Sequence, residues 1–306
     1  MKVLITGGTG FIGSNLCWHL LDKGYDITVL DNLSTGDINR LDESKIVIKT
    51  DLDVTKNIGV WVDGCFDVVI HLAAQIDVMA SIEDPLNDAM NNVMGTLNVL
   101  NMSRKCKVKK FIFASSNAVS GDQEPPVHEN MVPKPMSPYG ASKLAGEAYC
   151  SAFYHSYGFD TVALRFSNVY GPGALNQEGV ISLFAKQMIK DKSVCIFGDG
   201  KQTRDFIYVD DICKAIHLAL ETPNIGGQVF HVATETEISI YDLAVKMADI
   251  YGDKVDIIFK EARTGEIREN WSDISLARKT LGFKPDWELD DGLRITMDWF
   301  KENYKC

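Results

Sequence analysis

The segment with the clearest chemical potential is Ser137-Pro-Tyr-Gly-Ala-Ser-Lys143. Ser137 can cap a helix and Pro138 suits the first helical position, so Tyr139 and Lys143 fall on the early turns. Their four-residue spacing puts a phenol and an ammonium on one helix face. A free tyrosine has a pKa of about 10, and a fixed cation beside it favours the phenolate and brings that pKa towards neutral pH. The segment therefore predicts an acid/base pair, with an ordinary amphipathic helix as the alternative.

A glycine-rich loop near the start of the chain favours the chemical interpretation. Residues 3–6 read as a buried strand, residues 11–23 as a helix that Gly24 ends, and residues 27–30 as a second strand. Between strand and helix lies Gly7-Gly-Thr-Gly10-Phe11-Ile12-Gly13. Gly7 permits a tight turn, Gly10 lets the backbone approach a pyrophosphate, and Gly13 allows close helix packing. The amides at the helix N-terminus then face the phosphates, so the loop predicts dinucleotide binding.

An acidic residue, Asp31, closes the second strand of this βαβ unit. A carboxylate at this position accepts hydrogen bonds from ribose hydroxyls and repels a 2′-phosphate. No arginine follows until Arg40. The sequence therefore favours NAD over NADP, and the alternative for Asp31 is a solvated turn residue.

Strand and helix patterns continue to alternate along the chain. Apolar strands are expected at residues 46–49, 68–71, 111–114 and 161–165, with a helix over residues 85–106 and another from Ser137 to Gly158. This alternation predicts an α/β fold with a Rossmann-type, doubly wound parallel sheet. Ligands of such sheets gather at the carboxyl ends of the strands. Residues that directly follow predicted strands are Asp51, Leu52, Ala73, Ala74, Ser115, Ser116 and Asn168.

The regular alternation of strands and helices ends near Gly171, and after it glycine-rich turns separate shorter predicted elements. We expect residues 1–170 to form the NAD-binding domain and residues 171–306 to form mainly a smaller C-terminal substrate-binding lobe. Segments near residues 205–232 are expected to return to the main sheet.

Composition excludes several other classes of protein. The 306 residues carry a net charge of −11, which argues against nucleic acid as a partner, so an anionic ligand would need local arginines or helix N-termini. The seven cysteines contain no Cys-x-x-Cys pair and the six histidines no His-Glu-x-x-His spacing, so reduced thiols and no metal are expected. A strand that begins at Lys2 leaves no room for a signal peptide, and no apolar run is long enough for a membrane span. A cytoplasmic protein is expected.

Taken together, these motifs resemble the extended short-chain dehydrogenases/reductases over nearly the whole chain. Within that superfamily they most resemble the NAD-dependent sugar-nucleotide epimerases, UDP-glucose 4-epimerases among them. Further matching motifs are His71-Leu-Ala-Ala-Gln75, Asn92-Val-Met-Gly-Thr96, Arg165-Phe-Ser-Asn-Val-Tyr-Gly-Pro172, Gly198-Asp-Gly-Lys-Gln-Thr-Arg-Asp-Phe206 and Gly265-Glu-Ile-Arg268.

The resemblance implies a role for individual residues. Tyr139 would be the acid/base, Lys143 would bind the nicotinamide ribose, and Ser116 would hydrogen-bond the reacting hydroxyl. The implied cofactor-binding residues, besides Tyr139 and Lys143, are Gly7, Gly10, Phe11, Ile12, Gly13, Asp31, Asn32, Asp51, Leu52, Ala73, Ala74 and Asn92. The implied substrate-binding residues, besides Ser116, are Asn168, Val180, Arg204, Arg263 and Asn270, the two arginines clamping the diphosphate.

The residues after Ser116 bear on the type of reaction. Related sugar-nucleotide dehydratases carry an Asp-Glu pair there, whereas Asn117-Ala-Val-Ser120 has no carboxylate. The implied reaction is therefore epimerisation, by transient oxidation to a 4-keto sugar and hydride return to the opposite face. Alternatives are a 2-epimerase, a uronate 4-epimerase or a non-catalytic NAD-sensing protein. Departures from the common pattern at Ile76, Ser120 and Gly173 leave the sugar open.

Two finer expectations also come from the resemblance. Asn270 falls where a bulky tyrosine restricts some 4-epimerases to plain hexoses, so tolerance of both UDP-glucose and UDP-N-acetylglucosamine is expected. The alternatives are that a one-residue slip places Trp271 at this position, or that Asn270 only caps a turn. Relatives pair the helices near residues 85–106 and 137–157, which implies a homodimer. The stripe of Met90, Val93, Leu97 and Leu100 would form part of that interface, the alternative being that it faces its own sheet.

Overall fold

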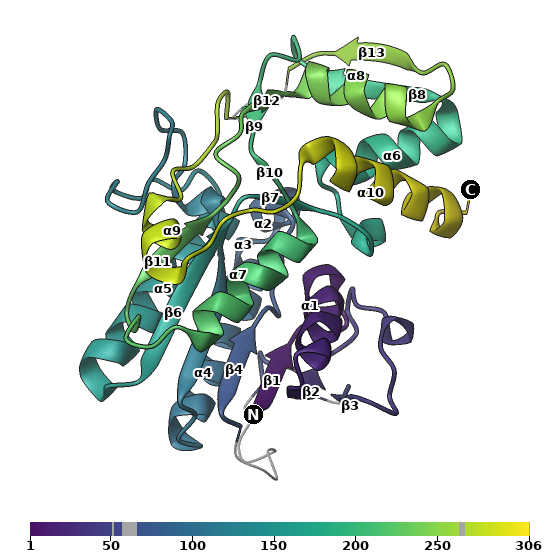
Figure 1. Ribbon diagram of the computed structural model, residues 1–306. Coiled ribbons are helices and arrows are strands. Elements are labelled where there is room, and N and C mark those ends of the chain that lie inside the picture. Colours follow the sequence, from purple (N-terminus) through teal and green to yellow (C-terminus); the bar gives the residue numbers. More distant parts are fainter. Residues whose placement is uncertain (51, 57–65, 263–266, 306) are drawn as a thin grey trace.

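A wholly parallel, seven-stranded sheet forms the base of the molecule. The computed structural model describes residues 1–50, 52–56, 66–262 and 267–305 (Figure 1). In spatial order the strands are β11 (Val229–Val232), β6 (Asp160–Phe166), β5 (Lys110–Ser116), β4 (Val68–His71), β1 (Lys2–Thr6), β2 (Asp26–Leu30) and β3 (Val47–Lys49). The order reverses at β1, which pairs with β2 on one side and β4 on the other. The expected doubly wound Rossmann-type sheet is confirmed, with its switch point beside β1.

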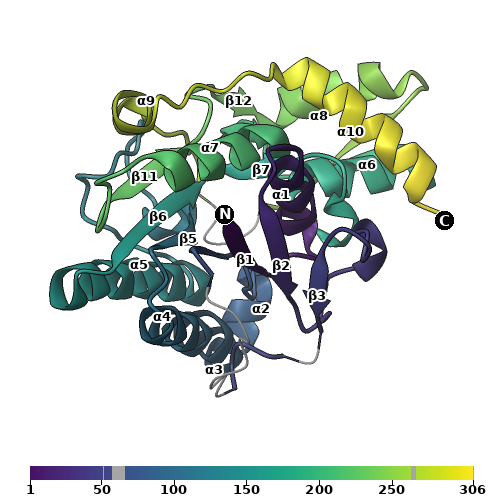
Figure 2. The same ribbon diagram turned by 60° about the horizontal axis from the view of Figure 1, so that its bottom comes forward.

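Helices cover both faces of this sheet (Figure 2). One face carries α1 (Phe11–Asp22) and α7 (Val209–Glu221), which pack on each other. The other face carries α4 (Gly95–Lys105) and α5 (Pro138–Tyr157), with α2 (Val78–Glu83) and α3 (Pro85–Ala89) nearby. The helix expected over residues 85–106 is present as α3, a wide π-type turn η2 (Met90–Met94) and α4.

Elements from Val180 onward build a second layer above the sheet (Figure 1). Its elements are α6 (Val180–Asp191), β8 (Ser193–Phe197), α8 (Ile240–Tyr251), β13 (Asp256–Lys260) and α10 (Leu289–Asn303). Shorter elements complete the fold: β7 (Asn168–Tyr170), β9 (Thr203–Arg204), β10 (Phe206–Tyr208), β12 (Ile238–Ser239), α9 (Ser275–Leu281), and the turns η1 (Ile38–Arg40), η3 (Asn117–Val119) and η4 (Ala174–Asn176). Because α7 and β11 pack in the base of the molecule, the chain crosses between the layers more than once. The domain boundary at residue 170 stays a prediction.

Burial explains why the strands read as continuous apolar runs. Strands β4, β5 and β6 are buried along nearly their whole length, because helices lie on both faces. One core cluster joins α1, α7 and the upper layer, and a second lies under α4 and α5 around Phe113 and Phe153. Among the helices of the described residues, none has the length and apolar character that crossing a membrane requires.

A buried chain of polar side chains fixes α5 against the sheet. Glu147 on α5 forms an ion pair with Arg165 on β6 at 2.8 Å, and both side chains are 5% exposed. Ser115 donates to Glu147 at 2.5 Å, and Arg165 lies 3.4 Å from His231 on β11. His231 Nδ1 in turn lies 2.7 Å from the Asn117 side-chain oxygen. The helix that begins at Pro138 is therefore held by charge and hydrogen bonds as well as by packing.

This ion pair gives a prediction about stability. Glu147→Gln leaves the Arg165 guanidinium buried without its counter-charge, and removing one partner of a buried pair costs about 3–5 kcal/mol. Urea denaturation should show this loss as a much lower midpoint. Asp253→Asn, which breaks the exposed Lys192–Asp253 pair, is the matched control and should leave the midpoint unchanged. Equal midpoints for the two variants would contradict the assignment of Glu147 as a buried structural charge.

Candidate active site

The glycine loop between β1 and α1 is as tight as its sequence predicts. Gly7 has a φ of +72°, and its amide donates to Leu30 O at 2.8 Å. A Cβ on Gly13 would lie 2.2 Å from Gly7 O, and one on Gly10 would lie 3.2 Å from the same atom. Because Gly10 is the N-cap of α1 and has no side chain, the first amides of the helix are left to a ligand.

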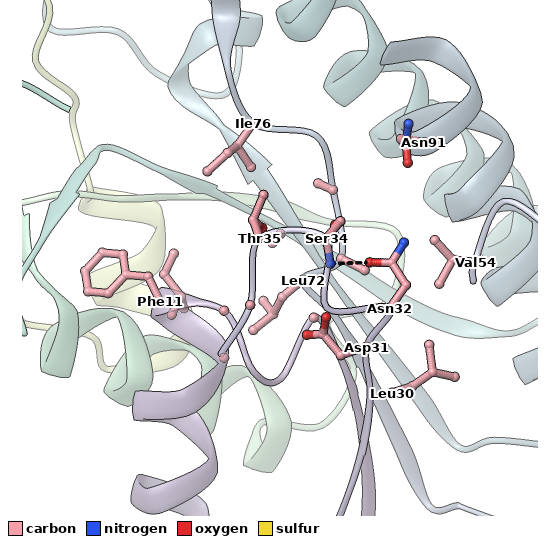
Figure 3. Close-up of a pocket in the computed structure, with 18 of the residues that line it drawn as sticks. Phe11, Leu30, Asp31, Asn32, Ser34, Thr35, Val54, Leu72, Ile76 and Asn91 are labelled. Carbon is pink, nitrogen blue, oxygen red and sulfur yellow. Dashed lines mark hydrogen bonds between the residues drawn. The ribbon is translucent and has the colours of Figure 1, made fainter. Parts of the chain in front are cut away.

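Asp31 lies at the end of β2, 8% exposed, with its carboxylate held by backbone amides. Its two oxygens accept from Thr9 N at 3.0 Å and from Leu33 N at 2.9 Å. The next residue, Asn32, accepts from Ser34 N at 3.1 Å, a bond drawn in Figure 3. Both side chains line the same cavity (Figure 3), so the carboxylate is fixed where a ribose hydroxyl can reach its remaining lone pairs.

One cavity connects this acidic end with the Tyr139 helix. It runs along the carboxyl ends of the strands, and its lining includes Tyr139 and Lys143. The expected cofactor-binding residues that also line it are Gly7, Gly10, Phe11, Ile12, Gly13, Asp31, Asn32, Leu52, Ala73 and Ala74. Asp51 lies outside the described residues. The cavity also takes in Phe166 and Gln177, which the sequence analysis did not single out.

Asn92 is not among the residues that line this cavity. Its buried side chain instead holds the loop that follows β4 through two hydrogen bonds. Its Oδ1 accepts from Gln75 N and its Nδ2 donates to Gln75 O, both at 2.9 Å. The same Nδ2 lies 2.9 Å from Asp88 Oδ1 and 3.1 Å from Ser142 Oγ. The π-type turn η2 carries Asn92, and such turns are frequent at functional sites.

The start of α5 follows its sequence signals. Ser137 is the N-cap and accepts from Gly140 N at 3.1 Å, and Pro138 is the first helical residue. The cap fixes the register of the helix. Tyr139 therefore falls on the first turn, with its backbone amide donating to Ser81 Oγ at 3.1 Å.

Tyr139, Lys143 and Ser116 meet at the carboxyl end of β5. Ser116 hydrogen-bonds the phenol of Tyr139. Lys143, one helical turn further on, donates to Ala114 O at 3.0 Å, and its ammonium lies 5.8 Å from the centroid of the Tyr139 ring. The structure therefore brings the three expected catalytic residues together, beside the cavity that the glycine loop begins.

Burial dominates the electrostatics of this pair. It raises the pKa of Tyr139 to about 12, the hydrogen bond from Ser116 opposes the rise, and Asp88 adds to it. Burial also lowers the pKa of Lys143 to about 8, against the opposing charge of Asp88. The expectation that Lys143 brings the pKa of Tyr139 down is wrong for the protein residues alone, because desolvation penalises the phenolate. A further cation at this place, such as an oxidised nicotinamide ring, would favour the phenolate.

The expected substrate residues fall into two places. Asn168, Val180 and Arg204 line a second cavity in the upper layer, together with Phe197 and Glu178. Arg263 lies outside the described residues.

The other place is a buried group around Asn270, which is 7% exposed. Its Oδ1 lies 3.4 Å from Asn117 Nδ2, which also donates to Ser272 Oγ at 2.6 Å. Asn117 is a residue whose role the sequence analysis missed. There it counted only as the absence of a carboxylate, and the partners that reveal it come from distant segments.

Fold and site together define a class of enzyme. A glycine cradle with a ribose-binding acid fits NAD, and the Ser116, Tyr139 and Lys143 group can move a proton on and off a substrate hydroxyl beside it. This is the site of a short-chain dehydrogenase/reductase.

Comparison with known proteins gives the family. Residues 3–233 match the model of the NAD dependent epimerase/dehydratase family. A putative UDP-glucose 4-epimerase of Methanocaldococcus jannaschii is 40% identical over 98% of this chain and 99% of its own. The chain belongs to this family, and its expected cofactor, NAD, is confirmed.

Solved structures give the same picture. A UDP-glucose 4-epimerase from Thermotoga maritima, solved with UDP-glucose, is 34% identical with a TM-score of 0.94, and all of both chains is covered. A UDP-glucuronic acid 4-epimerase from Bacillus cereus, solved with UDP-glucuronic acid and NAD, is 35% identical with a TM-score of 0.89, covering 99% of this chain and 100% of that one. The expected superfamily and the expected class of enzyme, an NAD-dependent epimerase, are confirmed.

The glycine cradle gives a prediction about the cofactor. Gly13→Ala pushes a Cβ against Gly7 O and opens the turn that receives the pyrophosphate, so the purified variant should carry little or no NAD. The parent protein, purified without added cofactor, should carry NAD that an enzymatic assay detects after denaturation. Gly179→Ala is the control, because no atom lies within 4 Å of its Cβ position. Equal NAD content in both variants would contradict the cradle.

Proposed function

We propose that the protein is a 4-epimerase of UDP-sugars that acts on UDP-glucose and UDP-N-acetylglucosamine. The observation that carries the proposal is the meeting of Ser116, Tyr139 and Lys143 beside the NAD cradle, next to a turn, η3, without a carboxylate. Dehydration of the same sugar needs an additional acid and base there. Epimerisation needs only the removal and return of one hydride at carbon and of one hydroxyl proton.

The chain's own residues handle the proton in this reaction. Ser116 would hold the hydroxyl at C4 of the sugar, and Tyr139 as phenolate would take its proton while the C4–O bond becomes a ketone. Bound NAD would supply the hydride chemistry at C4, so that the hydrogen leaves with its electron pair and comes back to the opposite face of the ketone. Tyr139 then gives the proton back, and Lys143 would hold the nicotinamide ribose throughout. No net oxidation occurs, so the cofactor can stay bound through turnover.

The second cavity supports a nucleotide diphosphate in the upper layer. Among the described residues that line it, Arg204 is the one cation, and a guanidinium fork matches phosphate oxygens. An acidic protein needs such a local cation to hold an anion. We assign Arg204, with Arg263, to the diphosphate, and Asn168 and Val180 to the substrate beside it.

The choice of sugar rests on fewer contacts. Asn270 is smaller than tyrosine and can hydrogen-bond an acetamido group, which favours tolerance of UDP-N-acetylglucosamine. A uronate 4-epimerase is the second candidate, because the Bacillus cereus relative acts on a uronate at similar identity. Glu178, which lines the second cavity, counts against a further carboxylate in the substrate.

A panel assay tests the proposal. Purified protein should interconvert UDP-glucose with UDP-galactose, and the matching N-acetylated pair, faster than it converts UDP-glucuronate or dTDP- and CDP-sugars. Tyr139→Phe keeps the ring and should keep the bound NAD, but the loss of a positioned acid/base should slow turnover by about 10²–10⁴-fold. Turnover close to the parent rate in Tyr139→Phe would contradict the mechanism. Preference for the uronate would favour the second candidate.

We also propose a cytoplasmic homodimer. Cytoplasmic location is supported by the five described cysteines, all of which are free thiols: Cys17, Cys106, Cys150, Cys195 and Cys213. Dimerisation is supported by an apolar face on α2, α3 and η2. Its exposed members are Met79, Ile82, Leu86, Met90 and Met94.

The four residues of the stripe expected from sequence do not form one exposed face. Met90 is exposed, but Leu100 is fully buried and Leu97 packs against the core cluster under α4. The wide turn η2 changes the helical phase between Met90 and Leu97, so the exposed face continues towards α2 instead.

The dimer gives a prediction about mass. Light scattering at micromolar concentration should give twice the 34.0 kDa of one chain. Leu86→Glu places a charge in the centre of the apolar face, because Leu86 is 78% exposed, and should shift the protein towards the monomer. Val47→Glu, at an exposed position on the edge strand β3, is the control and should leave the mass unchanged. A 34 kDa species in the parent protein would contradict the dimer.

A further inference from the structure

A buried carboxylate lies behind the Tyr139–Lys143 pair without a part in the reaction described so far. Asp88 on α3 is 1% exposed. Its Oδ1 lies 2.9 Å from Asn92 Nδ2, whereas its Oδ2 is fully buried and takes no hydrogen bond within the described residues. The nearby Ser142 hydroxyl donates to Tyr139 O at 3.0 Å. Burial raises the pKa of the Asp88 carboxyl. Ser142, Lys143 and Asn92 oppose that rise by favouring the carboxylate. A buried carboxylate that lacks part of its hydrogen bonding is costly unless a positive charge lies close to it.

The cation that interacts electrostatically with Asp88 is Lys143, on the neighbouring helix α5. The short helix α3 packs on α5, and the Asp88 carboxylate acts electrostatically on both Lys143 and Tyr139. The other groups around Asp88, Asn92 and Ser142, are neutral.

Lys143 has no other carboxylate to balance it among the described groups. His71 on β4 also faces the ammonium but is neutral, since burial lowers its pKa to about 3. The next acidic residue along α5, Glu147, is engaged by both arms of the Arg165 guanidinium. Asp88 is therefore the carboxylate that faces the Tyr139–Lys143 pair.

We propose that Asp88 is a positioning residue of this site, whose negative charge keeps the buried Lys143 protonated and so sets the pH range in which the Tyr139–Lys143 pair works. The carboxylate does not touch the substrate. It acts through Lys143, and it is anchored by the same asparagine that clamps the loop after β4. The assignment rests on the proposed function only in taking Tyr139 and Lys143 as the reacting pair.

The direction of the effect follows from charge alone. A negative charge stabilises the protonated form of each neighbour, so it raises the pKa of Lys143 and of Tyr139 together. Asp88→Asn removes the charge and keeps the size and an acceptor for Asn92. Both pKa values should then fall, and a bell-shaped pH–rate profile should move as a whole to lower pH.

A tyrosinate titration tests the proposal without any sugar. The absorbance of tyrosinate near 295 nm would be followed against pH in the NAD-bound protein, with the Tyr139→Phe protein subtracted to isolate one phenol. In Asp88→Asn the midpoint of the Tyr139 titration should fall by about one pH unit, which is the usual size of a pKa shift caused by the protein environment. Asp84→Asn is the matched control. It makes the same change in charge at the exposed N-cap of α3, where asparagine caps as well as aspartate, and should leave the transition in place.

A second variant guards against a folding defect. Asp88→Ser also removes the charge and keeps a hydroxyl that can accept from Asn92, so it should produce the same downward shift. A Tyr139 transition that stays at the parent pH in the folded Asp88 variants, or that moves equally in Asp84→Asn, would overturn the proposal. Absence of UDP-sugar turnover would affect only the proposed function, because the titration reads the phenol directly.

Discussion

The burial of two ionisable groups, Tyr139 and Lys143, is the constraint on which the active site depends. Desolvation pushes both towards their neutral forms, with the pKa of the phenol raised to about 12 and that of the ammonium lowered to about 8. A phenol with so high a pKa would give up its proton poorly near pH 7. Ser116 opposes the effect of desolvation on the phenol through its hydrogen bond. Asp88 opposes it on the ammonium through its charge, while the same charge adds to the rise of the Tyr139 pKa. An oxidised, positively charged nicotinamide ring, when bound, would favour the phenolate form of Tyr139, as the Ser116 hydrogen bond does.

The surrounding helices and strands fix the positions of Tyr139 and Lys143. The Ser137 cap sets the register of α5, and the Glu147–Arg165 ion pair ties the helix to β6. Asn92 joins the loop after β4 to Ser142 on α5, so the cofactor cavity and the catalytic helix share one clamp. A shift of α5 would therefore disturb the cradle and the acid/base pair together.

Much of this arrangement could be predicted from the sequence, because it follows from local signals. The glycine loop, Asp31 and the Ser137–Lys143 segment each carry their geometry within a few residues. The sequence could not predict the sign of the Tyr139 pKa shift, because burial comes from distant segments. It also missed the π-type turn η2, which moves Leu97 and Leu100 into the core, and the Asn117–Ser272 contact between segments far apart in the chain. The sequence shows that Asp88 precedes Asn92 by one helical turn, so a contact between their side chains could be predicted. The burial of Asp88 and its interaction with Lys143 could not, because they depend on how α3 packs on α5.

The central claim is that this chain moves only the hydroxyl proton, while the hydrogen at C4 of the sugar leaves and returns on the bound cofactor. Epimerisation of UDP-glucose deuterated at C4, carried out in ordinary water and followed by mass spectrometry and proton NMR, tests it most directly. The account predicts that the product keeps its deuterium at C4 and that none appears in the solvent. Loss of deuterium to water during epimerisation would show that the C4 hydrogen leaves as a proton, and would contradict the account.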